Sequence, residues 1–257
     1  MSPSFAYIYD SVYGQGMVSK ESARIEAELG RLGIQGPIFR EGFHEVQQQL
    51  DAAIKDGVKN VVFVGGDAWF LQRLPWIAQQ RGVSIGYLPS VPTALSRAIG
   101  MPPGAASVGI LAARVIKTLD LGAANDRPFL TEAVALETSA RLTLEGSYAV
   151  SARTPSPLAI QNFALQPKTG EVLSQSMDGQ LEAVLQTTVE RPGWLGVWKK
   201  TEIEETRIAF TRGAVQHPSG EPVHFTVDGQ PLTSKEVRFS VLPGALPLIV
   251  GPDRLFS

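Results

Sequence analysis

The sequence has no cysteine, few histidines and no excess of charge of either sign. Its 257 residues include three histidines, 23 Lys and Arg and 25 Asp and Glu, which gives a formal net charge of −2. Without cysteine there is no disulfide framework, no cysteine nucleophile and no thiolate zinc site. Without a basic excess, nucleic acid is not an expected partner. His44, His217 and His224 are scattered, so we expect solvated or packed side chains rather than metal ligands.

No stretch is expected to cross a membrane or to direct export. The longest run without charge, residues 98–113, is interrupted by Gly100, Pro102, Pro103 and Gly104. The first ten residues, MSPSFAYIYD, lack a basic head followed by an apolar stretch, so no signal peptide is expected. With 44% hydrophobic and 19% charged residues, the chain can bury a sizeable core. We therefore expect a cytoplasmic protein.

The first 120 or so residues alternate between short apolar runs and helical patterns. The apolar runs predict strands at residues 5–9, 37–39, 60–64 and 84–88. The helical patterns predict a helix with Ser19 as its N-cap, one from about residue 43 that stops at Gly57, one after Gly66, and two more within 93–99 and 105–116. This alternation predicts a parallel sheet with helices on both faces.

Beyond residue 122 the pattern becomes that of an all-β domain. Alternating or β-branched runs predict strands at 141–144, 180–188, 206–210, 224–227 and 237–242. Turn signals such as Asp178-Gly179 and Asp228-Gly229 separate them. We therefore predict an α/β domain over residues 1–122 and an antiparallel, sandwich-like β domain over 123–257.

Candidate site residues follow three of the predicted parallel strands. In an open parallel sheet, ligands bind at the carboxyl ends of the strands. Residues 9–16 follow the first strand, Gly65-Gly66-Asp67 follow the third and residues 89–93 follow the fourth. Two glycines at a strand end allow backbone N–H groups to approach an anion closely. The alternative is a tight turn with Asp67 as a helix N-cap, and the local pattern does not decide between the two.

Several short motifs, in one order, are similar to those of the diacylglycerol kinase catalytic domain family, which includes bacterial lipid kinases and sphingosine kinases. Residues 10–14 occupy the place of the family's Asn-Pro-x-x-Gly, and Gly65-Gly66-Asp67 that of Gly-Gly-Asp-Gly-Thr. The remaining matching segments are residues 86–89, 97–102 and 120–129, then Asp178-Gly179-Gln180-Leu181 and Val227-Asp228-Gly229-Gln230. The resemblance covers nearly the whole chain and implies a fold of the lipid-kinase and NAD-kinase type.

The resemblance also implies an activity, namely ATP-dependent phosphorylation of a lipid hydroxyl. ATP would bind between the two domains, and Gly14, Gly65, Gly66 and Asp67 would hold the nucleotide. Magnesium would be held by Asp67 and Asp228, and Asp228 would act as the general base. Phosphoryl transfer depends on positioning and charge stabilisation, so backbone donors, a metal ion and one carboxylate can suffice.

The chain departs from the family pattern at four places, which keeps a second hypothesis open. Asp10-Ser11 replace Asn-Pro, Ala68 and Trp69 replace Gly-Thr, the loop at 89–93 is one residue short, and Gln230 replaces a glutamate. An alanine adds a Cβ near the phosphates, and glutamine removes a charge that can hold magnesium. The alternative is therefore a catalytically inactive protein that retains the kinase fold and binds a lipid or a nucleotide.

Other candidate sites have weaker support. Gly14-Gln15-Gly16 is only half of a dinucleotide fingerprint, so a glycine-rich connecting loop is favoured over NAD(P) binding. No Gly-x-Ser-x-Gly elbow supports serine hydrolysis. Trp194 and Trp198 stand beside two lysines and are expected either to cover the β core or to rest on a membrane surface, and the core is favoured. The sequence favours no particular oligomeric state.

Overall fold

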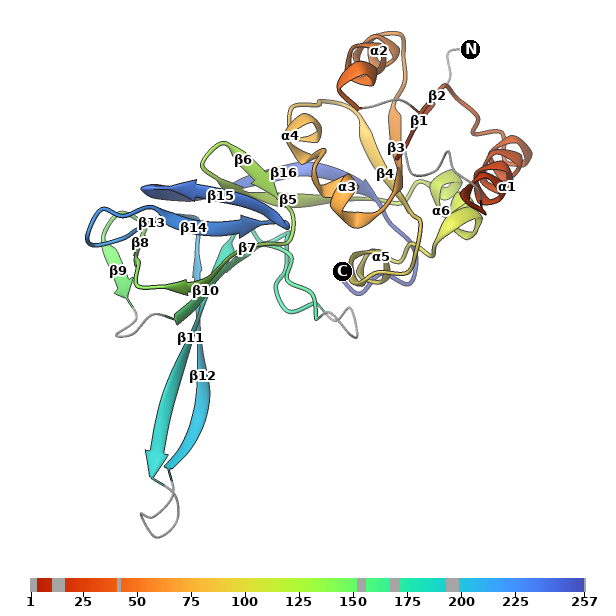
Figure 1. The fold of residues 1–257 in the computed structure, drawn as a ribbon. Helices are drawn as coiled ribbons and strands as arrows, with labels where there is room; N and C mark the ends of the chain where they lie inside the picture. Colours follow the sequence, from red (N-terminus) through yellow and green to blue (C-terminus); the bar gives the residue numbers. More distant parts are fainter. Residues whose placement is uncertain are drawn as a thin grey trace. The chain divides into compact units, whose positions relative to one another are not determined.

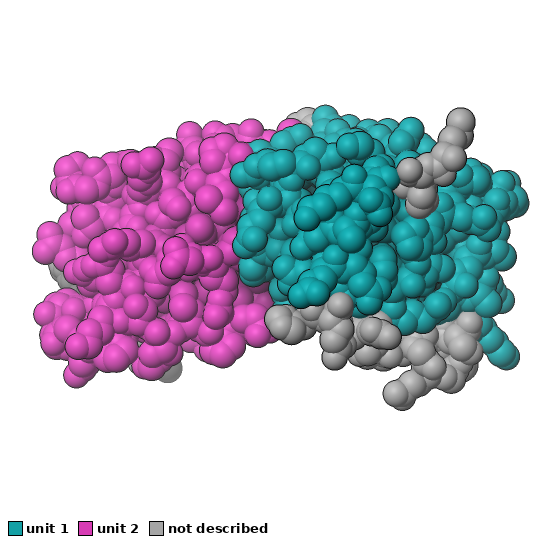
Figure 2. All heavy atoms as spheres, turned by 90° about the horizontal axis from the view of Figure 1, so that it is seen from above, with its two compact units in different colours: residues 1–119, 165–173, 244–257 teal, residues 120–164, 174–243 magenta. Residues whose placement is uncertain are grey.

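The computed structural model describes residues 4–10, 17–40, 43–151, 156–166, 172–192 and 199–256. The chain forms two compact units (Figures 1 and 2). Unit 1 comprises residues 1–119, 165–173 and 244–257, and unit 2 comprises residues 120–164 and 174–243. The sequence predicts one boundary between two domains near residue 122. In the structure, residues 165–173 and 244–257, which follow that boundary, belong to unit 1.

Unit 1 is built on a parallel sheet in the strand order β2-β1-β3-β4. Its strands are β1 (Phe5–Tyr9), β2 (Ile38–Phe39), β3 (Asn60–Gly65) and β4 (Ser84–Pro89). Every residue of β1 and β3 is buried, as the uninterrupted apolar runs predict. The end of β16 (Glu236–Ile249) adds a further parallel neighbour to β4, with Leu248 opposite Ile85. The four predicted strands are thus confirmed.

Helices cover both faces of this sheet (Figure 1). Phe63 and Tyr87 lie opposite each other in the register, and their rings contact Phe70 of α3. The neighbouring pair, Val62 and Gly86, projects to the other face, where Leu111 of α6 packs against Gly86. The helices are α1 (Met17–Arg31), α2 (Phe43–Lys55), α3 (Asp67–Leu71), α4 (Leu74–Ile77), α5 (Ala94–Ala98) and α6 (Val108–Ala113), with a 3₁₀ turn at Gly104–Ser107.

Two local predictions about these helices are wrong, and one alternative that the sequence left open, Asp67 as an N-cap, is not realised. Helix α1 begins at Met17, so Ser19 lies inside it and is not its N-cap. The N-cap of α3 is Gly66, and Asp67 is the first residue of the helix. The helix predicted after Gly66 is two short helices, because Pro75 has no N–H with which to continue the hydrogen-bond ladder and stands instead in the first turn of α4. Within the described residues, no helix is long and apolar enough to span a bilayer.

Unit 2 consists of two antiparallel sheets that pack against each other, as the sequence predicts. Leu142, Val215 and Phe239 of one sheet share a buried core with Ile160 and Phe225 of the other. The first sheet contains β5 (Ile116–Ala124), β6 (Arg127–Phe129), β8 (Arg141–Leu144), β9 (Tyr148–Ser151), β13 (Arg212–Gln216) and the start of β16. The second has the order β12-β11-β10-β7-β14-β15, formed by β7 (Glu132–Thr138), β10 (Ser156–Gln161), β11 (Leu181–Pro192), β12 (Lys199–Phe210), β14 (Val223–Val227) and β15 (Gln230–Ser234).

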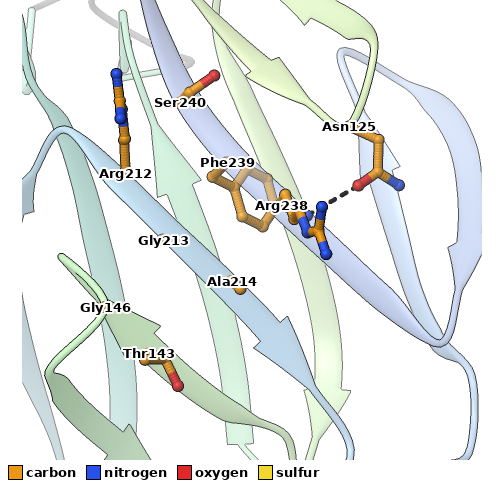
Figure 3. A pocket seen from close by; sticks show the side chains of 9 residues that line it. All are labelled: Asn125, Thr143, Gly146, Arg212, Gly213, Ala214, Arg238, Phe239 and Ser240. Carbon is orange, nitrogen blue, oxygen red and sulfur yellow. Dashed lines mark hydrogen bonds between the residues drawn. The ribbon is translucent and has the colours of Figure 1, made fainter.

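A shallow hollow of about 350 Å³ lies on the first sheet of unit 2 (Figure 3). Thr143, Ala214 and Arg238 occupy one row across three strands, and Arg212 is opposite Ser240 in the next row. Asn125 closes one side, where its Oδ1 accepts a hydrogen bond from the backbone N–H of Arg238 at 2.9 Å. None of these residues is a site residue predicted from the sequence.

Glu145, at the turn that follows β8, provides a test of the local geometry. Its Oε1 accepts hydrogen bonds from the backbone N–H of Thr211 at 2.7 Å, the Thr211 hydroxyl at 3.0 Å and the backbone N–H of Arg212 at 3.3 Å. The backbone donors, and then the hydroxyl, hold the pKa of Glu145 below its ordinary value. A lowered folded-state pKa means that this stabilisation is present above the unfolded pKa and is lost as the pH falls through the folded pKa.

We therefore expect a carboxyl titration followed by NMR to give Glu145 a pKa below that of an ordinary glutamate. Thr211→Val should move the pKa part of the way back, because the backbone donors stay in place. Thr233→Val is the matched control, since Thr233 contacts His224 and not Glu145. A Glu145 pKa at the ordinary value in the unaltered protein would contradict the hydrogen bonding described here.

Candidate active site

The loops that follow β1, β3 and β4 meet at one edge of the sheet of unit 1. The backbone N–H of Asp10 donates to the Val64 carbonyl at 2.9 Å, and that of Ser90 donates to the Gly65 carbonyl at 2.9 Å. The three strand ends are therefore tied together beside the double glycine, as expected for the carboxyl edge of a parallel sheet. Gly14, which the family resemblance assigns to the nucleotide, lies outside the described residues.

The two glycines of this turn have different surroundings. A Cβ placed on Gly65 would lie 2.9 Å from the Asp10 Cβ and 3.1 Å from Cε3 of Trp69, so packing requires a glycine there. A Cβ on Gly66 would meet no atom of the described part of the chain within 4 Å. The backbone of Gly66, with φ −90° and ψ 161°, is also open to any residue. Neither packing nor backbone conformation thus explains the glycine at position 66, which leaves free space beside the strand end.

Asp67 is held in place by two hydroxyl groups from β4 and from the segment that follows it. Its Oδ1 accepts hydrogen bonds from the Tyr87 hydroxyl at 2.6 Å and from the Thr93 hydroxyl at 3.0 Å. Thr93 is itself fixed, because it is the N-cap of α5 and forms a capping box with Ser96. The other carboxylate oxygen of the half-buried Asp67 accepts no hydrogen bond from the described residues. One oxygen is thus used for positioning and the other is available to a ligand.

Trp69 and Arg73 form a stacked pair next to the glycine turn. The Arg73 guanidinium lies 5.2 Å from the centre of the Trp69 ring, and that ring makes an edge contact with Phe63. Burial lowers the pKa of Arg73, while the nearby Asp10 carboxylate acts in the opposite direction. Ala68 is exposed, so its Cβ points away from the packed core. The departure at position 69 therefore places a ring where the family motif has a threonine, and Arg73 stacks on that ring.

Asp228 belongs to unit 2 and lies in the turn between β14 and β15. Its φ of 43° and the φ of 79° at Gly229 are those of a two-residue hairpin turn with two left-handed residues. Its carboxylate accepts hydrogen bonds from the backbone N–H groups of Leu130 at 2.7 Å, Thr131 at 2.9 Å and Glu132 at 3.2 Å, and from the Thr131 hydroxyl. The carboxylate therefore anchors this turn to the segment between β6 and β7.

Burial raises the pKa of Asp228, and hydrogen bonds from Thr131, Leu130 and Glu132 act in the opposite direction. The geometry shows Asp228 as an acceptor of four hydrogen bonds that hold its turn in place. Gln230, where the family has glutamate, begins β15 opposite Val227. Asp178 instead accepts a hydrogen bond from the Gln180 N–H at 3.0 Å, which stabilises its own turn.

The sequence interpretation missed the residues that position the predicted carboxylates. Tyr87 falls in a predicted strand and a family-like segment, and Thr93 ends the candidate loop 89–93, but the sequence assigns neither residue a contact with Asp67. For Tyr87, a single polar atom within the apolar run of β4 was the available signal. Thr131 carried no signal, because its contact with Asp228 spans 97 residues of sequence.

The residues present at Asp67 fit a magnesium ion bound together with a nucleotide. Magnesium usually retains several waters and takes one or two carboxylates plus phosphate oxygens from its substrate. The second oxygen of Asp67 and the free space at Gly66 match that requirement. Among the described residues there is no group of three or more His, Asp or Glu side chains that could hold a metal ion without a nucleotide.

Comparison with solved structures identifies the fold. A structure of a diacylglycerol kinase from Bacillus anthracis strain Sterne matches with a TM-score of 0.76 and 14% sequence identity, over 98% of each chain. Two further structures from the same strain, assigned only provisionally as diacylglycerol kinases, match with TM-scores of 0.77 and 0.76, again with 14% identity. No protein-family model and no curated protein sequence matches the chain. The chain has the diacylglycerol kinase fold.

Proposed function

We propose that this protein transfers the γ-phosphoryl group of ATP to a lipid hydroxyl in the cytoplasm. The observation that carries the proposal is the free space at Gly66 beside a positioned Asp67, at the carboxyl edge of the sheet. The diacylglycerol kinase fold supports the proposal. So do Gly65, Gly66 and Asp67, which match the first three residues of the family's glycine motif.

Each residue has a defined task in this reaction. Gly66 leaves room for phosphate oxygens close to the backbone, and the free oxygen of Asp67 would hold magnesium. Magnesium, when bound, offsets the negative charge on the transferring phosphoryl group. Asp228 would accept the proton of the lipid hydroxyl. The hydroxyl oxygen would then bond to the γ-phosphorus, while the bond between this phosphorus and the bridging oxygen breaks and ADP leaves. Tyr87 and Thr93 hold Asp67 in one orientation.

A second candidate function is binding of a nucleotide or lipid without transfer. Trp69 favours it, because its ring packs beside Gly65 where the family has a threonine. Gln230 also favours it, because a neutral side chain stands where the family has a glutamate. Nucleotide binding without turnover is the result that would distinguish this alternative from the enzyme.

The substitution Asp67→Asn tests the proposal. We expect magnesium ATP to raise the melting temperature of the unaltered protein, since a ligand that binds the folded state stabilises it. Asp67→Asn should lose most of this shift and of phosphoryl transfer to diacylglycerol or sphingosine in detergent micelles. Asp56→Asn, an exposed aspartate in the same unit, is the matched control. A protein that shows no thermal shift over a wide range of magnesium ATP would contradict both candidate functions that involve a nucleotide.

A further inference from the structure

A hollow in unit 1 lies at the amino ends of its parallel strands, at the edge of the sheet opposite the candidate active site. Its volume is about 360 Å³. Asn60, which lines it, is the first residue of β3, and Gly65 is the last. At about 3.3 Å per residue, these two residues are about 17 Å apart. We call this feature the amino-edge hollow, and it is lined by Lys59, Asn60, Gly82, Ser84, Ala113, Arg114 and Ile116.

Backbone hydrogen bonds hold the base of the amino-edge hollow in place. The backbone N–H groups of Lys59 and Asn60 donate to the Ser4 carbonyl at 3.1 and 2.9 Å, and that of Ser84 donates to the Lys59 carbonyl at 2.8 Å. The side-chain amide of the buried Asn60 also donates to the Ser4 carbonyl, at 2.9 Å. The hollow is therefore built on the fixed starts of strands, which position side chains more precisely than loops do.

Helix α6 brings Arg114 to the same face of the sheet. Asn60 and Ser84 form the register pair two residues before Val62 and Gly86, the pair that faces α6, so they face α6 as well. Arg114 is the C-cap of this helix, with φ 51° and ψ 46°. Glycine or asparagine is the usual residue in this left-handed conformation. The Arg114 guanidinium donates no hydrogen bond to a described residue, so capping of the helix carbonyls does not account for the arginine either.

Lys59 and Arg114 are exposed cations with no acid beside them. Neither forms an ion pair with any described residue, and the Arg114 guanidinium lies 6.0 Å from the centre of the Phe5 ring. The hydroxyl of the half-buried Ser84 also has no hydrogen-bond partner in the described part of the chain. The residues that line the hollow include no acid. Two positive charges and a hydroxyl donor are therefore available to a ligand.

The charges of two other hollows are balanced by acids. In the hollow shown in Figure 3, Arg238 forms an ion pair with Glu236, and Glu145 accepts a hydrogen bond from the backbone N–H of Arg212. A hollow beside α5 is lined by one basic and one acidic residue. The amino-edge hollow differs from both, because its charged lining residues have a single sign.

We propose that the amino-edge hollow binds a phosphate monoester. Such a group carries close to two negative charges at neutral pH, and two cations suit it better than a carboxylate, which a single arginine can pair with. Arg114 can offer a planar fork to two phosphate oxygens, Lys59 adds a compact charge, and the Ser84 hydroxyl can donate to a third oxygen. The volume is in the range of small-molecule sites, which leaves room for the alcohol part of the ester beside Ile116.

The same phosphate chemistry is offered by a soluble ester and by the headgroup of phosphatidic acid, and the experiment below separates these two sources. Binding at the amino-edge hollow needs neither nucleotide nor magnesium, so it stands independently of phosphoryl transfer. Trp194 and Trp198, for which the sequence considered membrane contact, lie outside the described residues, and the inferred site does not involve them.

The experiment is a titration followed by backbone amide NMR, without nucleotide. The ligands are inorganic phosphate, glycerol 3-phosphate and dihexanoyl phosphatidic acid below its critical micelle concentration, with sodium chloride at matched ionic strength as the reference. We expect saturable shifts at Lys59, Ser84 and Arg114 with the phosphate ligands and none with chloride. Tighter binding of glycerol 3-phosphate would identify a soluble ester as the ligand, and tighter binding of phosphatidic acid would identify the headgroup.

Three double variants make the titration specific. Lys59→Gln with Arg114→Gln should weaken binding at least about tenfold, because both cations are lost. The matched control is Lys20→Gln with Arg24→Gln, which removes the same charge from exposed positions of α1 and should bind within a few fold of the unaltered protein. Lys59→Arg with Arg114→Lys keeps both charges and should also bind within a few fold. A loss confined to the first variant would therefore be due to charge.

Three results would overturn the proposal. These are equal weakening in both glutamine variants, equal shifts with chloride, and saturable shifts that are absent or confined to the turn at residues 65–67. Gly66→Val alters that turn and should leave phosphate binding at the amino-edge hollow unchanged. A protein that binds phosphate esters here but shows no phosphoryl transfer would contradict the proposed function alone.

Discussion

Replacing Gly66 with valine is expected to abolish the thermal shift produced by magnesium ATP while leaving the protein about as stable as before. A Cβ at this position would meet no atom of the described residues within 4 Å, and the backbone is already extended. Loss of glycine's freedom in the unfolded chain offsets the poorer N-cap, so the net change should stay within about 1 kcal/mol. The valine would occupy the space assigned to phosphate oxygens, so nucleotide affinity should fall at least about tenfold, which isothermal titration can measure.

Two companion variants make this experiment specific. Gly109→Val, at an exposed glycine of α6 whose Cβ would also meet nothing within 4 Å, should leave the nucleotide shift unchanged. Gly65→Ala should instead destabilise unit 1 by about 1–3 kcal/mol, because its Cβ would crowd Asp10 and Trp69. An unchanged nucleotide shift in Gly66→Val would remove the observation on which the proposed function depends.

Asp228→Asn is expected to eliminate phosphoryl transfer while the thermal shift with magnesium ATP remains. The amide cannot accept the proton of the lipid hydroxyl, so the transfer rate should fall by about a hundredfold or more. In the unaltered enzyme the acidic limb of the rate-against-pH profile should lie above that of an ordinary aspartate, because burial raises the pKa of Asp228. The limb should disappear in the variant, since the group that titrates is gone.

The structural role of Asp228 calls for its own control. Asp228→Ala would leave three backbone N–H groups and the Thr131 hydroxyl without their acceptor, so the free energy of unfolding should fall by about 3–5 kcal/mol. Thr131→Val keeps the carboxylate and should cost about 1 kcal/mol with transfer retained. If Asp228→Asn transferred phosphate at the unaltered rate, Asp228 would be an anchor of its turn and not the base.

The Asp67 and Asp228 environments show where sequence interpretation succeeds and where it stops. The double glycine and both aspartates can be found from the sequence, because each belongs to a short motif of neighbouring residues. The hydroxyls on Asp67 come from 20 and 26 residues away. Nothing within either neighbourhood indicates that these groups meet, because the meeting depends on β3 and β4 being adjacent strands.

The sequence by itself determined the alternation of strands and helices in unit 1 and the β-rich nature of unit 2. It could do so because burial on one or both faces of an element imposes a periodicity on its own residues. It also located the glycine turn. Only the tertiary structure decided that packing requires a glycine at Gly65 and not at Gly66, that Asp67 is positioned by Tyr87 and Thr93, and that Asp228 is anchored by Leu130, Thr131 and Glu132. These facts depend on strand order, register and the packing of side chains distant in sequence, which local periodicity does not encode.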